Sequence, residues 1–180
     1  LDLNRVFPGD PNGHLTEVIA YWMVEELLPR ADIVIDFHAG GDDSFLVPGP
    51  ICHPLEDRTL QRRLLDLMRA FKTPCALIAD EPKAETMWDA QVEAAGKLFL
   101  TAEMGAAGTL TPTSLQMTEH TIANILIHLG MQDANANEYV PWGEWDEPKL
   151  LTTSKTGFLP LPKAGFFIPS VPVGERLEAG

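Results

Sequence analysis

Three groups of residues in this sequence carry side chains that could do chemistry. His38 follows a predicted strand at 32–37, and Glu103 follows another at 97–102. A glycine stands two residues after each of them, where it would break the strand. In an open α/β sheet, functional groups gather at the carboxyl ends of the strands, so we expect both side chains to point into one crevice. There a histidine suits a metal ligand and a glutamate suits a general base.

The third group is the pair Asn4–Arg5, which stands just before the turn-rich segment 8–13. A guanidinium can hold a carboxylate through two parallel hydrogen bonds, and a neighbouring amide can assist it. Each signal alone also has a plain structural interpretation. His38 would merely end a strand, Glu103 would be a solvated edge residue, and Arg5 would be a surface residue in a turn.

Taken together, the three groups resemble the succinylglutamate desuccinylase/aspartoacylase family, whose members are relatives of the zinc carboxypeptidases. The resemblance runs through residues 1–130 and is carried by three motifs, Asp-Leu-Asn-Arg at 2–5, Asp-Phe-His at 36–38 and Glu-Met-Gly at 103–105. The longer stretch Asn-Arg-Val-Phe-Pro-Gly at 4–9 is most similar to the branch of the family that contains N-acetyl-diaminobutyrate deacetylases.

The resemblance implies a zinc-dependent hydrolase that cleaves the amide bond of an N-acyl amino acid. It assigns His38 as the last of three zinc ligands and Glu103 as the catalytic general base. It assigns Asn4 and Arg5 as the pair that binds the substrate carboxylate. The family's other two ligands form a His-x-x-Glu motif upstream of the Asn-Arg pair, so we expect them to precede Leu1. The chain is therefore predicted to be a fragment that lacks the N-terminal part.

A literal His-x-x-Glu motif is also present at His14–Glu17, but it follows the Asn-Arg pair instead of preceding it. It leads into a predicted helix, where the helix dipole favours an acidic residue in the first turn. We therefore interpret Glu17 as a helix-start residue and not as a zinc ligand. His120 and His128 are interpreted as surface or partly buried residues of one helix.

Helices and strands alternate between residues 16 and 130, which predicts an α/β fold with a mostly parallel sheet flanked by helices. The spacing of apolar residues predicts helices at 16–29, 55–71, 85–95 and 111–130, and strands at 32–37, 75–79 and 97–102. The proline-rich segment 50–54, which includes His53, is interpreted as a loop.

The last part of the chain differs from the rest, because it is rich in proline and shows no helical periodicity. Short β-type runs occur at 150–153 and 165–168. We therefore predict two parts, an α/β zinc-hydrolase domain at 1–136 and a small, incomplete β appendage at 137–180.

Composition limits the partners that this chain can have. Its formal net charge of −13 argues against nucleic acid, because no basic surplus is available to displace counterions from phosphates. Cys52 and Cys75 form neither a disulfide framework nor a metal-binding pair, which favours a reducing, cytoplasmic location. No apolar run has the roughly 18 residues of a membrane helix. We expect a small N-acyl amino acid as the partner. A homo-oligomer is also compatible with the sequence.

Two other functions fit the same residues. One is a succinylglutamate desuccinylase or carboxypeptidase-like activity on the same scaffold. The other is a non-catalytic relative that keeps the carboxylate pocket and has lost its zinc site. The sequence does not identify the acyl group, because the residues that shape the pocket cannot be recognised from it.

Overall fold

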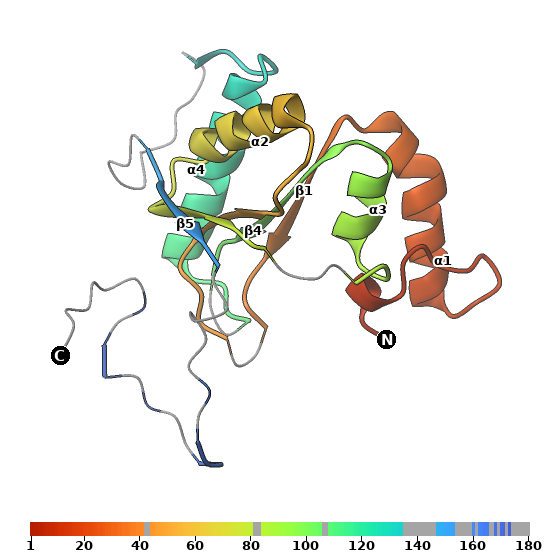
Figure 1. Ribbon diagram of the computed structural model, residues 1–180, viewed down its shortest axis with the longest axis horizontal. Coiled ribbons are helices and arrows are strands. Elements are labelled where there is room, and N and C mark those ends of the chain that lie inside the picture. Colours follow the sequence, from red (N-terminus) through yellow and green to blue (C-terminus); the bar gives the residue numbers. More distant parts are fainter. Residues whose placement is uncertain are drawn as a thin grey trace.

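The computed structural model describes residues 1–41, 44–80, 84–105, 108–134 and 147–153, together with residues 160, 162–165, 168, 170–171 and 173. Helices lie on both sides of one five-stranded sheet, with α2 and α4 on one side and α1 and α3 on the other (Figure 1). The predicted α/β class with a sheet flanked by helices is confirmed.

The predicted helices and strands occur in the predicted order, and β2 is an addition to them. The helices are α1 (Leu15–Trp22), α2 (Arg58–Ala70), α3 (Trp88–Ala94) and α4 (Pro112–His128). The strands are β1 (Ile33–His38), β2 (Gly49–Cys52), β3 (Cys75–Ile78), β4 (Leu98–Glu103) and β5 (Lys149–Thr152). Three short turns of helix complete the set, η1 (Leu3–Arg5), η2 (Met23–Leu27) and η3 (Leu28–Arg30). Within the described ranges, no helix has the length and apolar character needed to cross a membrane.

The sheet has the strand order β1-β4-β2-β3-β5. Strand β1 runs parallel to β4, β2 runs parallel to β3, and β3 runs parallel to β5. Only the β2–β4 pair is antiparallel among these neighbours. The prediction of a mostly parallel sheet is therefore confirmed, and the carboxyl ends of β1 and β4 lie at the same edge.

Strand β4 joins two apolar clusters on opposite faces of the sheet. Leu98 and Leu100 pack with the helices α2 and α4 in one cluster, whereas Phe99 packs with α1 and α3 in the other. Alternate side chains of a strand point to opposite faces, so a run of apolar residues is what a strand covered on both sides requires. This burial holds the end of β4, where Glu103 lies, in a fixed position.

Strand β2 corrects the interpretation of the segment 50–54 as a loop, because residues 49–52 pair with both β3 and β4. Glycine and proline are depleted in strands, so the presence of both in β2 favoured the interpretation as a loop. The glycine is needed here, since a Cβ atom on Gly49 would lie 2.2 Å from the backbone oxygen of Cys75. The missing side chain lets the two strands approach.

Residues 149–152 form the strand that the β-type run at 150–153 predicted, but this strand belongs to the main sheet. It pairs in parallel with β3 and forms the sheet edge opposite β1. The division into two parts at residue 137 stays a prediction, because most of the tail lies outside the described residues. The same holds for most of the run predicted at 165–168.

Candidate active site

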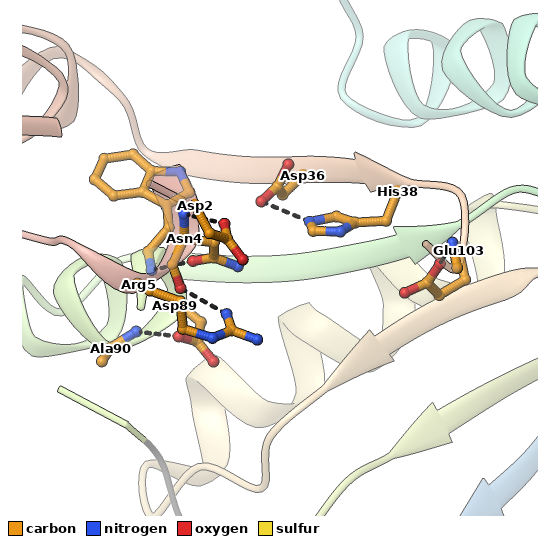
Figure 2. Close-up of polar contacts among 10 residues, drawn as sticks. Asp2, Asn4, Arg5, Asp36, His38, Asp89, Ala90 and Glu103 are labelled. Carbon is orange, nitrogen blue, oxygen red and sulfur yellow. Dashed lines mark hydrogen bonds and ion pairs between the residues drawn. The ribbon is translucent and has the colours of Figure 1, made fainter. Parts of the chain in front are cut away.

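His38 and Glu103 lie side by side at the carboxyl ends of β1 and β4. The two residues are direct partners in the parallel register. Paired residues on neighbouring strands have side chains on the same face, and the strands are about 4.8 Å apart. Both residues lie at one edge of the sheet, whereas the predicted crevice shared by their side chains and their chemical roles stay predictions. Figure 2 shows the imidazole of His38 between Asp36 and Glu103.

Asp36 is a site residue to which the sequence reasoning gave no role. Its Oδ2 atom lies 2.9 Å from Nε2 of His38, and both side chains are about one-third exposed, at 32% and 36%. The hydrogen bond to Asp36 raises the pKa of His38, although burial partly opposes this, and the negative charges of Asp36, Glu103 and Asp2 raise it further. The signal was present in the sequence, because residues two apart on a strand share a face.

The carboxylate of Glu103 is held by the turn that follows β1. Its Oε2 atom accepts a hydrogen bond of 3.1 Å from the backbone N–H of Gly40. Gly40 has a φ angle of +63°, and a Cβ atom there would lie 2.6 Å from the backbone oxygen of Ser44. Only glycine adopts this conformation in so little space. The glycine that ends the strand therefore also orients the glutamate.

Asn4 and Arg5 are placed by the contact between η1 and the start of α3. The Oδ1 atom of Asn4 accepts a hydrogen bond of 2.8 Å from the backbone N–H of Trp88. Asp2 accepts one of 2.9 Å from the backbone N–H of Asn4, and Arg5 donates one of 2.6 Å to the backbone oxygen of Asn4. The Asn4 amide has no other hydrogen-bond partner among the described residues, so its two N–H donors can bind a carboxylate.

A cavity of about 520 Å³ brings Asn4 and His38 together. Its polar lining also includes Asp2 and Asp36, and its apolar lining comes mainly from β1 and from η2 and η3. Glu103 and Arg5 do not line this cavity. His38 also lines a smaller cavity of about 240 Å³ beside Met104 and Gly105 at the end of β4. His38 and its neighbour Phe37 thus line both spaces, and His38 is the polar residue of the two.

Glu17 lies in the first turn of α1, as the sequence predicted. The backbone N–H of His14 donates a hydrogen bond of 2.7 Å to Oε2 of Glu17, at the start of α1. The carboxylate is thereby used as a helix cap. His128 is exposed and His120 is partly buried, and burial lowers the pKa of His120. These positions agree with their interpretation as ordinary helix residues.

A second group of titratable side chains lies where β2 meets α3. Nδ1 of His53 is 3.2 Å from Oε1 of Glu93 and 3.6 Å from Oδ2 of Asp89. All three side chains are largely buried, with 16% of His53, 8% of Glu93 and 10% of Asp89 exposed. The neighbouring thiol of Cys52 is also buried, and this burial raises its pKa to about 12. Sequence reasoning missed the group because its members are far apart in the chain.

His38 fits one position of a zinc site. Imidazole nitrogen is a preferred zinc ligand, and one bound to a metal typically donates its other N–H to a carboxylate, as His38 is placed to do toward Asp36. Across the described residues, no group of three or more histidine, cysteine or acidic side chains is arranged to hold a metal ion. Among the described residues, His38 is therefore a candidate for one ligand position.

This chain belongs to the succinylglutamate desuccinylase/aspartoacylase family, whose catalytic-domain model matches residues 1–129. It is 39% identical over 173 residues to the N-alpha-acetyl-L-2,4-diaminobutyric acid deacetylase of Halomonas elongata. That match covers 96% of this chain and 47% of the relative. The predicted family is confirmed, and the similarity agrees with the predicted branch.

Solved structures give the same family. The product-bound ectoine utilization protein EutE (DoeB) from Ruegeria pomeroyi matches with a TM-score of 0.74 and 36% identity, over 86% of this chain and 45% of that one. A succinylglutamate desuccinylase/aspartoacylase from Rhodobacter sphaeroides matches with a TM-score of 0.87 and 28% identity, over 100% of this chain and 53% of that one. The chain thus spans about half the length of these relatives.

Proposed function

We propose that this chain is part of a zinc-dependent hydrolase that removes the acyl group from an N-acyl amino acid. The observation that carries the proposal is the pairing of His38 with Glu103 at the carboxyl ends of two parallel strands. Membership of the desuccinylase/aspartoacylase family supports it. A metal ligand beside a base is the combination that hydrolysis of an amide by water requires.

Glu103 acts as the general base in this proposal. Its carboxylate takes a proton from the attacking water and then passes that proton to the leaving amine. The hydrogen bond from Gly40 leaves the other carboxylate oxygen available and keeps the side chain at the sheet edge. Asn4 and Arg5 bind the carboxylate of the substrate, which aligns the amide bond for attack. The products are a carboxylic acid and an amino acid.

His38 is the zinc ligand that this chain contributes. When bound, zinc polarises the acyl carbonyl and makes water acidic enough to react at neutral pH. We propose that the other two ligands come from polypeptide outside these residues, upstream of Leu1. The match of the whole chain to about half of each relative is consistent with that arrangement.

The relative from Halomonas elongata is named for the deacetylation of N-alpha-acetyl-L-2,4-diaminobutyric acid, and we propose a substrate of the same kind here. The similarity to a succinylglutamate desuccinylase/aspartoacylase keeps the removal of succinyl or aspartate-linked acyl groups as the alternative. A cytoplasmic location, the lack of nucleic-acid and membrane partners, and the oligomeric state stay predictions.

A substrate panel tests the proposal. The full-length protein is assayed for release of free amine from N-alpha-acetyl-L-2,4-diaminobutyrate, N-succinylglutamate and N-acetylaspartate, before chelation, after chelation and after zinc is restored. We expect hydrolysis of the first substrate, loss of activity on chelation and recovery with zinc. Activity on another member of the panel would select the alternative. Binding of these compounds without hydrolysis in the presence of zinc would instead indicate a non-catalytic relative.

A further inference from the structure

The strand β1 places a carboxylate directly behind the imidazole of His38. Asp36 and His38 are two residues apart, and the strand pairs them with Thr101 and Glu103 of β4. Both therefore project from the same face of a strand that is hydrogen-bonded to its neighbour. The 2.9 Å separation of Oδ2 and Nε2 is within hydrogen-bonding distance (Figure 2).

This contact determines which imidazole nitrogen is available to a metal. An ionised carboxylate can only accept hydrogen bonds, so Nε2 must carry the proton that lies between the two groups. In a neutral imidazole the lone pair is then on Nδ1. Across the described residues, Nδ1 of His38 has no hydrogen-bond partner. The nitrogen that faces away from Asp36 is thus the one able to bind a cation.

The contact also limits the orientation of the ring. A histidine side chain has two rotatable bonds, and a free ring can present either nitrogen in several directions. The carboxylate of Asp36 cannot move with a rotating His38 ring, because the backbone of β1 is fixed by its register with β4. The hydrogen bond therefore restricts the ring to one orientation. Fixing the donor in advance reduces the conformational entropy that metal binding would otherwise cost.

We propose that Asp36 is a positioning residue for His38, which fixes the imidazole with Nε2 protonated and presents Nδ1 to the metal. The inference rests on the proposed zinc-dependent function. Asp36 does not touch substrate in this proposal and acts only through His38. It is separate from the roles of Glu103, Asn4 and Arg5, which the family resemblance already implied.

Two measurements on the full-length protein test the proposal, using Asp36→Ala, Asp36→Asn and the control Asp66→Ala. Asp66 is also an aspartate with one ion-pair partner, Arg69, but it lies on the exposed surface of α2. The first measurement is zinc affinity by competition with a chromophoric chelator. The second is the tautomer of His38 in metal-free protein, from imidazole nitrogen chemical shifts at a pH where the ring is neutral.

We expect Asp36→Ala to weaken zinc binding by about 10–100-fold and to convert the Nε2-protonated form of His38 into a mixture of tautomers. Asp36→Asn should lie between this variant and wild type, because its amide oxygen can still accept the hydrogen bond. Asp66→Ala should match wild type in both measurements. Wild-type zinc affinity and tautomer in Asp36→Ala would overturn this inference and leave the proposed function standing. A full-length wild-type protein that binds no zinc would overturn both.

Discussion

Three carboxylates act on the imidazole of His38, the proposed zinc ligand. Asp36 accepts a hydrogen bond from Nε2 of His38, and Glu103 is the register partner of His38 on β4. The charge of Asp2 also acts on this imidazole. Carboxylates close to an imidazole favour its charged form. The same charges favour a bound cation, so a divalent metal at this position would neutralise a local excess of negative charge.

His38 and His14 give contrasting predictions for metal binding. In the full-length protein, His38→Ala should lower the zinc content, because it removes a proposed ligand. His14→Ala should leave the zinc content unchanged, since the Glu17 carboxylate beside it bonds the backbone N–H of His14 and not its side chain. Metal analysis of both purified variants is sufficient. The reverse pattern would show that His14 and not His38 is the ligand.

Arg5→Lys is expected to weaken substrate binding although the charge is kept. Lysine cannot form the two parallel hydrogen bonds of a guanidinium with a carboxylate. The loss of one charge-assisted hydrogen bond should lower kcat/KM by an amount equivalent to about 1.5–3 kcal/mol. Steady-state kinetics on the full-length protein measure this change.

A matched substitution controls for the general effect of replacing arginine by lysine. Arg30 is exposed and pairs with Glu26 one helical turn away, so Arg30→Lys should change kcat/KM and stability little. If Arg5→Lys behaves like Arg30→Lys, then Arg5 does not bind the substrate carboxylate.

At the scale of elements, the turn after β1 links the two strand ends of the site. Gly40 donates its backbone N–H to Glu103, and its conformation leaves no space for a side chain. The turn therefore connects the strand of the proposed metal ligand to the strand of the proposed base. This connection depends on the backbone of the turn on one side and on the Glu103 carboxylate on the other.

Gly40→Ala and Gly41→Ala separate close packing from backbone conformation. Both glycines have a positive φ angle, of 63° and 64°, so alanine costs about 1–2 kcal/mol at either position. Of these two positions, only Gly40 would bring the new Cβ atom within 3 Å of a backbone atom. We expect Gly40→Ala to lose more unfolding free energy than Gly41→Ala and also to lower kcat. Equal effects of the two variants on both quantities would contradict this account.

The elements that could be predicted from the sequence are those with a clear apolar pattern. Helix α2 follows from apolar spacing, because its buried residues lie on one face, and the strands β1, β3 and β4 follow from short apolar runs. Helix α4 was predicted as well, although Leu115 and Ile122 on it are exposed. Strand β2 could not be predicted, since Gly49 and Pro50 are poor strand residues and only the close approach to β3 explains the glycine. The placement of β5 beside β3 depends on tertiary packing alone.

The site was predictable in part for the same reason. His38 and Glu103 are found from strand ends and family motifs, and the register then brings them together. The contacts of Asn4 with Trp88 and of His53 with Glu93 join residues far apart in the chain. No local pattern encodes such pairs, so they become visible only in the folded chain.

At the scale of the whole molecule, strand β1 is at the edge of the sheet, next to the site. The 520 Å³ cavity lies along this strand, and a second cavity of about 770 Å³ is lined by Ile33, Ile35 and Phe37 of the same strand. Among the described strands, His38 is thus on the edge strand, with Glu103 on the strand next to it. This position is compatible with the proposal that further zinc ligands come from outside these 180 residues.

The central claim is that Glu103 is the base of a zinc-dependent hydrolase, and Glu103→Gln tests it most directly. Glutamine has the same size, and its amide oxygen can still accept the hydrogen bond from Gly40, so the fold and the zinc content should be unchanged. Without a proton acceptor, kcat of the full-length protein should fall by about 10²–10⁴-fold, whereas the exposed control Glu119→Gln should match wild type. Near-normal turnover of Glu103→Gln would contradict the account, and loss of zinc would make Glu103 a ligand instead of a base.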